Sequence, residues 1–147
     1  MKLFIGADHA GYELKEELKP LIKELGFEIV DKGAFAYDVK DDYPDFCLPV
    51  AEEVAKLPDH VKGIVIGGSS VGEAIVANRL KGVRAVGYYG GNIDLVKLSR
   101  EHNNANILSL GARLMPPEEA KYAVKIWLTT PFTDDDRHKR RIDKIDK

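Results

Sequence analysis

The amino-acid sequence predicts a three-layer, doubly wound α/β domain built on a five-stranded parallel sheet. Short apolar runs alternate with longer amphipathic runs through the whole chain, and the short runs are apolar at nearly every position. Strands that are apolar on both faces are typical of parallel sheets covered by helices on both sides. The alternation implies right-handed crossovers between strands, as in Rossmann-like folds.

Five short apolar runs are the expected strands, and several of them end in glycine. In chain order they are residues 2–6, 27–31, 63–67, 83–87 and 107–111. Amphipathic segments between and after them are the expected helices. After the first helix, described next, they cover residues 46–57, 70–80, 92–103, 117–129 and about 134–145.

The first expected helix follows the first strand. Its apolar positions recur at three- and four-residue spacing, at Leu14, Leu18, Leu21 and Leu25. Gly26 is placed as its stop, because glycine accepts the left-handed backbone that ends many helices. Pro20 lies inside the pattern, so we expect a kink or a break there.

Composition limits the classes of function. One domain over residues 1–147 is expected, since no linker, repeat or low-complexity segment divides the chain. The net charge of −2 gives no global attraction for nucleic acid or an anionic membrane. No segment is long enough to span a bilayer, and the single cysteine, Cys47, excludes an intrachain disulfide. We therefore expect a cytoplasmic protein.

In such folds ligands bind at the carboxyl ends of the strands, which directs attention to the residues after strands one, three and five. Asp8 and His9 follow the first strand. Asp8 is equally well explained as a helix N-cap, a common role for aspartate. The histidine beside it favours a ligand contact.

A glycine- and serine-rich turn follows the third strand and enters a helix. It comprises Gly68, Ser69, Ser70, Val71 and Gly72, with Glu73 next. Such a turn presents backbone N–H groups to an anion, but it is neither a Walker A loop nor a dinucleotide fingerprint. A tight turn that needs glycine dihedrals explains it equally well. An acid such as Glu73 in a first helical turn is also ordinary helix-dipole pairing.

Three further sets of polar residues are candidates. His102 is able to act as acid or base near neutral pH, or to lie as a charge at a helix C-terminus, and Asn103 is typical of a chain reversal. Arg113 follows the fifth strand. Arg137 and Arg141 are four residues apart, so they share a helix face suited to phosphate, although a solvated charge run is the commoner explanation.

No metal or organic cofactor is indicated. The four histidines are scattered along the chain, and Cys47 is not within ligand spacing of any of them. Cys47 also lies in an expected amphipathic helix, where a buried packing role is usual for cysteine. The least regular stretch, residues 32–45, is long enough to suggest a role at a site.

The ordered set GADHAGYELK, DDYP, GGSSVGE, REHNNAN, LGARL and TPF followed by RHKRRI resembles the type B ribose-5-phosphate isomerase family, which includes allose- and galactose-6-phosphate isomerases. The resemblance covers nearly the whole chain. One branch of the family carries a cysteine base at the end of strand three, where this chain has Gly67. The other branch carries a glutamate at the start of the next helix, and Glu73 matches it.

The resemblance implies an aldose–ketose isomerase of carbohydrate metabolism that acts on D-ribose 5-phosphate in the pentose phosphate pathway. Glu73 would be the base and His102 the acid that helps to open the sugar ring. The sugar contacts would be Asp8, His9, the 68–72 loop and Asn103, with the phosphate bound by Arg113, Arg137 and Arg141. A helix N-terminus lowers a carboxylate pKa, which would weaken Glu73 as a base but stabilise the enediolate.

The resemblance further implies the strand order 2-1-3-5-4 and a homodimer, alone or paired into a tetramer, with a site shared between subunits. It leaves open which subunit supplies His102 and each arginine. Ser70 and Val71 depart from the commonest forms of the glutamate branch, so the backbone at Ser70 needs a test. Three alternatives remain: a six-carbon aldose phosphate as substrate, a non-catalytic sugar-phosphate sensor, and a flavodoxin-like flavin carrier.

Overall fold

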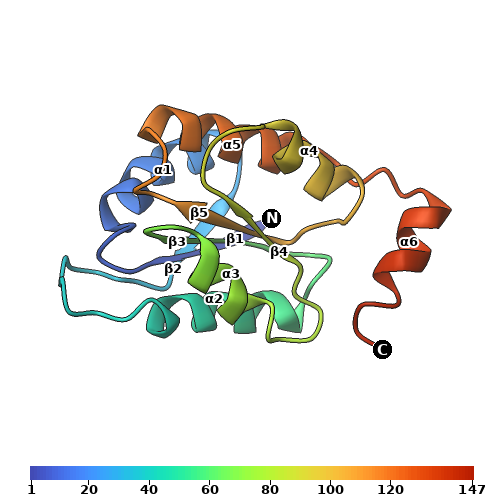
Figure 1. Ribbon diagram of the computed structural model, residues 1–147, viewed down its shortest axis with the longest axis horizontal. Helices are drawn as coiled ribbons and strands as arrows, with labels where there is room; N and C mark the ends of the chain where they lie inside the picture. Colours follow the sequence, from blue (N-terminus) through green and yellow to red (C-terminus); the bar gives the residue numbers. More distant parts are fainter.

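The computed structural model describes all residues, 1–147, and is built on one five-stranded parallel sheet (Figure 1). The strand order is β2-β1-β3-β5-β4, as the family resemblance implies. The strands are β1 (Lys2–Ala7), β2 (Glu28–Asp31), β3 (Lys62–Gly67), β4 (Ala85–Tyr88) and β5 (Ile107–Gly111). All four pairings are parallel, so the carboxyl ends of the five strands meet at one edge of the sheet.

The three central strands are buried on both faces, which explains their continuous apolar sequence. In β1, β3 and β5 nearly every residue is shielded from solvent. The fourth strand begins two residues later than predicted, at Ala85 rather than at residue 83. The N–H of Arg84 is taken by the side chain of Asn106 at 2.7 Å instead of by a neighbouring strand.

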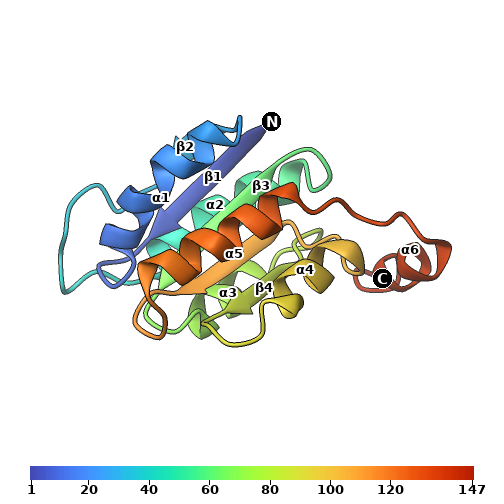
Figure 2. The same ribbon diagram turned by 90° about the horizontal axis from the view of Figure 1, so that it is seen from above.

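Helices cover both faces of the sheet, which confirms the predicted three layers (Figures 1 and 2). One layer contains α1 (Tyr12–Glu24), α4 (Asp94–Glu101) and α5 (Pro117–Thr129), and its core centres on Trp127. The other contains α2 (Pro44–Lys56) and α3 (Val71–Ala77), with a smaller core that includes Cys47. The last helix, α6 (Asp136–Ile142), lies beyond the end of the sheet (Figure 1).

Helix ends follow local chemistry more closely than the apolar pattern suggested. The third, fourth and sixth helices are each shorter than predicted. Helix α1 continues through Pro20 without a break, because Pro20 lies on the exposed face, where water can satisfy the carbonyl that its missing N–H leaves free. Gly26 ends the helix as expected, with φ of +90° and its N–H donated to the carbonyl of Lys23.

The irregular segment between β2 and α2 is fixed to the end of β1. Ala7 donates its N–H to the carbonyl of Gly33 at 2.8 Å, and Ala34 donates to the carbonyl of Ala7 at 2.7 Å. The fully buried Lys15 donates to both carboxylate oxygens of Asp31 at 2.8 Å and to the carbonyl of Ala34 at 2.7 Å. A buried ammonium is tolerated only when such partners compensate it, so Lys15 ties this segment to α1.

Candidate functional site

A pocket of about 520 Å³ lies at the carboxyl edge of the sheet, where the fold class places ligands. The segments that follow β1, β3 and β5 converge there, together with the start of α2. The lining residues are Asp8, His9, Ala10, Tyr43, Gly68, Ser69, Val71, Gly72, Glu73, Arg113 and Leu114. Most of the predicted site residues are therefore brought together in one chain, with Arg113 as the arginine that reaches the pocket.

Glu73 is a buried carboxylate packed against the end of β3. It is 3% exposed, and a Cβ placed on Gly67 would lie 1.5 Å from its Oε1. The glycine at position 67 therefore leaves the space that the carboxylate occupies, and a cysteine side chain there would displace it. Glu73 Oε2 is buried and makes no hydrogen bond, so one oxygen is available to accept a proton.

The electrostatic surroundings of Glu73 favour a base. Burial raises its pKa above the ordinary value for glutamate, and the negative charge of Asp8 adds to the rise against an opposing backbone hydrogen bond. The expectation that the helix N-terminus would leave Glu73 with a lowered pKa was therefore wrong, because removal from water outweighs it. A carboxylate with a raised pKa is a stronger proton acceptor than one in water.

Cys47, in contrast to Glu73, is not placed to act as a base, although it lies in α2 in the same helical layer as α3. Its side chain is fully buried. Burial raises the pKa of the Cys47 thiol well above its ordinary value, and the charges of Glu73 and Asp8 raise it further. A thiol held in this way stays protonated, and protonated thiols are poor nucleophiles and bases.

The turn after β3 has free donors and an unusual backbone. Ser70 adopts φ of +71°, a left-handed conformation that favours glycine, so the serine accepts the backbone that the family's glycine would provide. Its carbonyl accepts the hydroxyl of Ser109 at 2.8 Å. The N–H groups of Ser69 and Ser70 donate to no backbone carbonyl. Of the two, Ser69 lines the pocket and its free donor suits an anion, whereas the predicted site residue Ser70 is buried beneath the turn and does not line the pocket.

Tyr43 is a lining residue that the sequence reasoning did not single out. Its ring packs so closely on Gly72 that a Cβ at that glycine would lie 2.6 Å from the ring carbon Cζ. Tyr43 precedes α2 and so belongs to the irregular segment for which a site role was predicted. The motif DDYP, which contains Tyr43, was the feature of the sequence that could have identified it as a lining residue.

Asp8 lines the pocket but is not the N-cap of α1, because that position is Gly11 and α1 has no side-chain cap. Its Oδ1 accepts the N–H of Ala10 at 3.0 Å and of Gly11 at 3.3 Å, which fixes the turn before α1. His9 contacts Asp41 from the irregular segment, with Nδ1 2.6 Å from Asp41 Oδ1. Possible ligand atoms of Asp8, His9 and Asp41 lie within 4.8 Å of one another, so the expectation of no clustered ligands was wrong.

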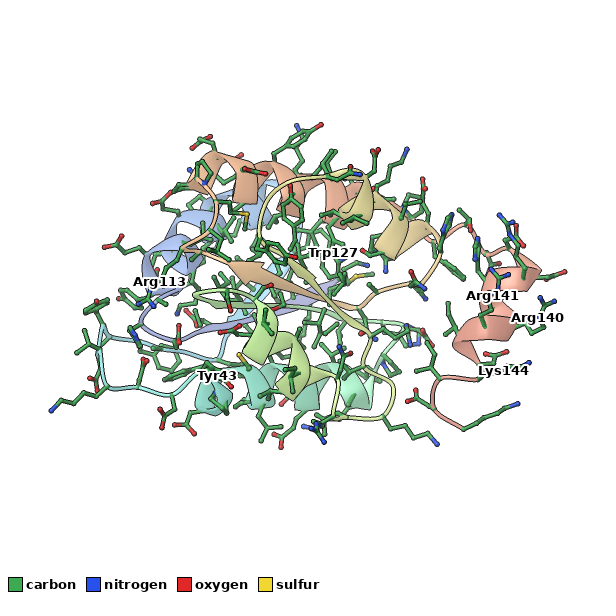
Figure 3. The ribbon with its side chains drawn as sticks, in the orientation of Figure 1. Tyr43, Arg113, Trp127, Arg140, Arg141 and Lys144 are labelled. Atoms are coloured by element: carbon green, nitrogen blue, oxygen red, sulfur yellow. The ribbon has the colours of Figure 1, made fainter.

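A second group of predicted site residues lies at the opposite edge of the sheet. His102 caps the C-terminus of α4, and Asn103 follows it, so both precede β5 instead of following a strand. Strands of five or six residues are roughly 17–20 Å long, which separates this edge from the pocket. Figure 3 shows Arg113 and Tyr43 at one end of the molecule and Arg141 at the other.

The C-terminal helix is held at this second edge by His102. The imidazole rings of His102 and His138 stack with centroids 4.3 Å apart and an angle of 18° between the planes. Asp135 caps α6 by accepting the N–H of Arg137 at 3.0 Å. Arg137 and Arg141 are both exposed on α6, and their four-residue spacing places them on one face of this helix. We call His102, Asn103, Arg137 and Arg141 the amino-edge group.

No helix in the structure combines the length and the apolar character needed to cross a membrane.

Comparisons with known proteins agree on one family. A family model described as Ribose/Galactose Isomerase matches residues 3–145. Ribose-5-phosphate isomerase B of Mycobacterium leprae is 43% identical over 143 residues, which cover 97% of this chain and 86% of that protein. The Escherichia coli protein of the same name is 37% identical over 144 residues, covering 98% and 93%.

Solved structures give the same result. Ribose-5-phosphate isomerase B from Mycoplasma genitalium, with bound ribulose-5-phosphate, is similar with a TM-score of 0.93 and 40% identity over 98% of this chain and 93% of that chain. The protein of that name from Clostridium thermocellum has a TM-score of 0.90 and 42% identity over 99% and 95%.

Proposed function

Since this chain belongs to the ribose/galactose isomerase family, we propose that it interconverts D-ribose 5-phosphate and D-ribulose 5-phosphate. The observation that carries the proposal is the buried Glu73 carboxylate, with one unpaired oxygen, in a pocket that also contains unpaired backbone donors. The relative from Mycoplasma genitalium binds ribulose-5-phosphate, which supports a sugar phosphate as the ligand.

The reaction moves one proton between neighbouring carbons. In the open-chain aldose, Glu73 removes the C2 proton, the C–H electrons form the C1–C2 double bond, and the carbonyl π electrons move to O1. The enediolate then takes the proton back from Glu73 at C1, while the O2 hydroxyl loses its proton and O1 gains one. The carbonyl is thereby moved to C2, and no electrons enter or leave the substrate.

The turn after β3 would stabilise the charge that develops on the enediolate oxygens. Ser69, whose N–H group donates to no backbone carbonyl, lines the pocket together with Glu73, whereas the neighbouring Ser70 is buried and does not line it. Removal of one donor of this kind from an oxyanion site typically costs about 3–4 kcal/mol of transition-state stabilisation. This contribution would let a carboxylate deprotonate a weak carbon acid without a metal or an organic cofactor.

The amino-edge group would complete the pocket from a second copy of the chain. Its four members lie a sheet's length from Glu73 within one chain, and two of them are exposed arginines suited to phosphate. In a homodimer His102 of one subunit would help to open the furanose ring bound beside Glu73 of the other. Arg113 would meet the phosphate together with Arg137 and Arg141. A cytoplasmic location and the single domain over residues 1–147 are also part of this proposal.

The test is a turnover assay with three substrates side by side: ribose 5-phosphate, allose 6-phosphate and galactose 6-phosphate. Ribose 5-phosphate should give the highest kcat/KM, and activity should survive exhaustive chelation. Faster turnover of a six-carbon substrate would assign that substrate to the protein but leave the proposed mechanism unchanged. Binding of all three without conversion would show a sensor instead of an enzyme.

A further inference from the structure

Asp41 contacts the pocket histidine from a distant part of the chain. It lies 32 residues after His9, yet one of its carboxylate oxygens accepts two hydrogen bonds from that residue. The backbone N–H of His9 donates to Oδ1 at 3.0 Å, and the ring Nδ1 lies 2.6 Å from the same oxygen. The side chain of Asp41 is only 10% exposed and that of His9 19%, so water competes little for this contact.

The chemistry of the pair fixes the proton on the imidazole. An ionised carboxylate only accepts hydrogen bonds, so Nδ1 must carry the hydrogen that lies between the two groups. Nε2 is then the ring nitrogen that remains for a ligand. Charge-assisted bonds of this length are roughly twice as strong as neutral ones. The contact therefore selects both the tautomer and the orientation of the ring.

The segment that carries Asp41 is fixed, so the carboxylate does not simply follow the histidine. Its first residues pair with the end of β1, and Lys15 holds the carbonyl of Ala34 at 2.7 Å. The ring of Tyr37, from the same segment, meets the His9 ring edge-on with centroids 6.3 Å apart. His9 is thus enclosed by a segment anchored independently of it.

Building on the isomerase function proposed above, we propose that Asp41 is a positioning residue for the reaction. It holds His9 as the Nδ1–H tautomer and presents Nε2 to the bound sugar phosphate, without touching the substrate itself. A divalent cation on the same three side chains would have to displace the Nδ1 hydrogen or use other atoms of the cluster. The two converging bonds from His9 favour the hydrogen-bonded pair.

The kinetic test compares Asp41→Ala with Asp41→Asn. Loss of a hydrogen bond to a charged group should lower kcat/KM for ribose 5-phosphate by about ten- to a hundredfold in Asp41→Ala. Asp41→Asn keeps an acceptor for both bonds and should recover most of that loss. The matched control is Asp38→Asn, which removes the same charge from the same segment at an exposed side chain that contacts only the N–H of Lys40. Its kcat/KM should equal that of the wild type.

A double-mutant cycle separates positioning from a purely structural role. If Asp41 acts through His9, Asp41→Ala should change kcat/KM by less than about twofold in a His9→Ala background, because the group it orients is absent. An equal loss in both backgrounds would overturn the proposal and assign Asp41 to the shape of the segment. Wild-type kinetics in Asp41→Ala alone would overturn it as well.

The ring itself gives a readout that does not depend on turnover. The ¹⁵N shifts of His9 should show Nδ1 protonated in the wild type and a shift toward the Nε2–H tautomer in folded Asp41→Ala, with Asp41→Asn close to the wild type. Unchanged tautomers in both variants would overturn the proposal. A wild-type protein that shows this tautomer but turns over no sugar phosphate would instead contradict the proposed function.

Discussion

The two edges of the sheet hold functional residues in different ways. At the carboxyl edge, Asp8 and Glu73 are buried and held by short connections from central strands. At the amino edge, Arg137 and Arg141 are exposed on a terminal helix that lies outside the layers (Figure 1). The first group is fixed by the fold of one chain, whereas the second has no partner within reach of its guanidinium groups beyond Asp135. The difference is consistent with the proposal that chemistry and phosphate recognition are carried by different parts of the molecule.

The largest expected effect tests the carboxyl edge alone. Glu73→Gln keeps the size of the side chain but removes the basic oxygen, so kcat should fall by about 10²–10⁴-fold while substrate still binds. Exchange of the C2 hydrogen with solvent deuterium should fall equally. Cys47→Ser is the control and should keep its turnover per folded molecule. If Glu73→Gln exchanges the C2 hydrogen at the wild-type rate, the base is another residue.

The second prediction concerns whether the two edges work within one chain or between chains. Glu73→Gln and His102→Ala should each be nearly inactive alone, because every site of either homodimer lacks one group. After subunit exchange in an equal mixture, hybrid dimers should carry one intact site, which restores roughly a quarter of the wild-type sites. Mass spectrometry would show that hybrid dimers have formed. If the mixture is then no more active than its components, both residues belong to a site within one chain, and the proposed shared site is wrong.

A smaller effect is expected at the exposed edge. Arg137→Ala should weaken recognition of the phosphate by roughly ten- to a hundredfold, because a charged hydrogen bond is lost. The loss should fall mainly on KM, in contrast to the loss of kcat in Glu73→Gln. Arg140→Ala, the neighbour on the same exposed helix, is the charge-matched control. If Arg137→Ala has the same kinetics as the wild type, the arginines of α6 do not bind phosphate and form only a solvated face.

The smallest effect is on stability and distinguishes the buried Glu73 carboxylate from an ordinary surface acid. Because the folded state raises the pKa of Glu73, ionisation costs stability above the unfolded pKa of 4.5, and the full cost is present above the folded pKa. Glu73→Gln should therefore raise the Tm near pH 7, and its advantage should shrink as the pH falls toward 4.5. Melting curves across this range measure it. A constant difference at all pH values would remove the electrostatic explanation.

Much of the fold could be predicted from the sequence because parallel strands buried on both faces have continuously apolar sequences. Residues 63–67 and 107–111 are strands, as that signal predicts. The start of β4 could not be found in this way, because the side chain of Asn106 determines where pairing begins. The ends of α3 and α4 were missed because the amphipathic pattern continues past them, and neither helix has an N-terminal side-chain cap that would mark its start.

The pocket was predictable only where its residues directly follow strands. Glu73 and Arg113 were found by position and by motif, and both line the pocket. Tyr43 lines the pocket and Asp41 contacts the lining residue His9. Both belong to a segment with no periodic pattern, so their placement depends on contacts between residues distant in sequence, such as that between Lys15 and Ala34. The roles of the amino-edge group stay predictions: the mixing experiment tests that of His102, and the kinetics of Arg137→Ala test that of Arg137.

The close packing of Glu73 on Gly67 has a consequence for how such a protein changes over time. The resemblance implies that the two branches of the family place their base in the same small volume, since a Cβ at position 67 would lie 1.5 Å from the Glu73 carboxylate oxygen. On the proposed mechanism, a cysteine acquired first would push the Glu73 carboxylate aside, and a glutamate lost first would leave no base. Either single step therefore passes through an impaired ancestor, so the two chemistries should separate as distinct lineages instead of interchanging freely.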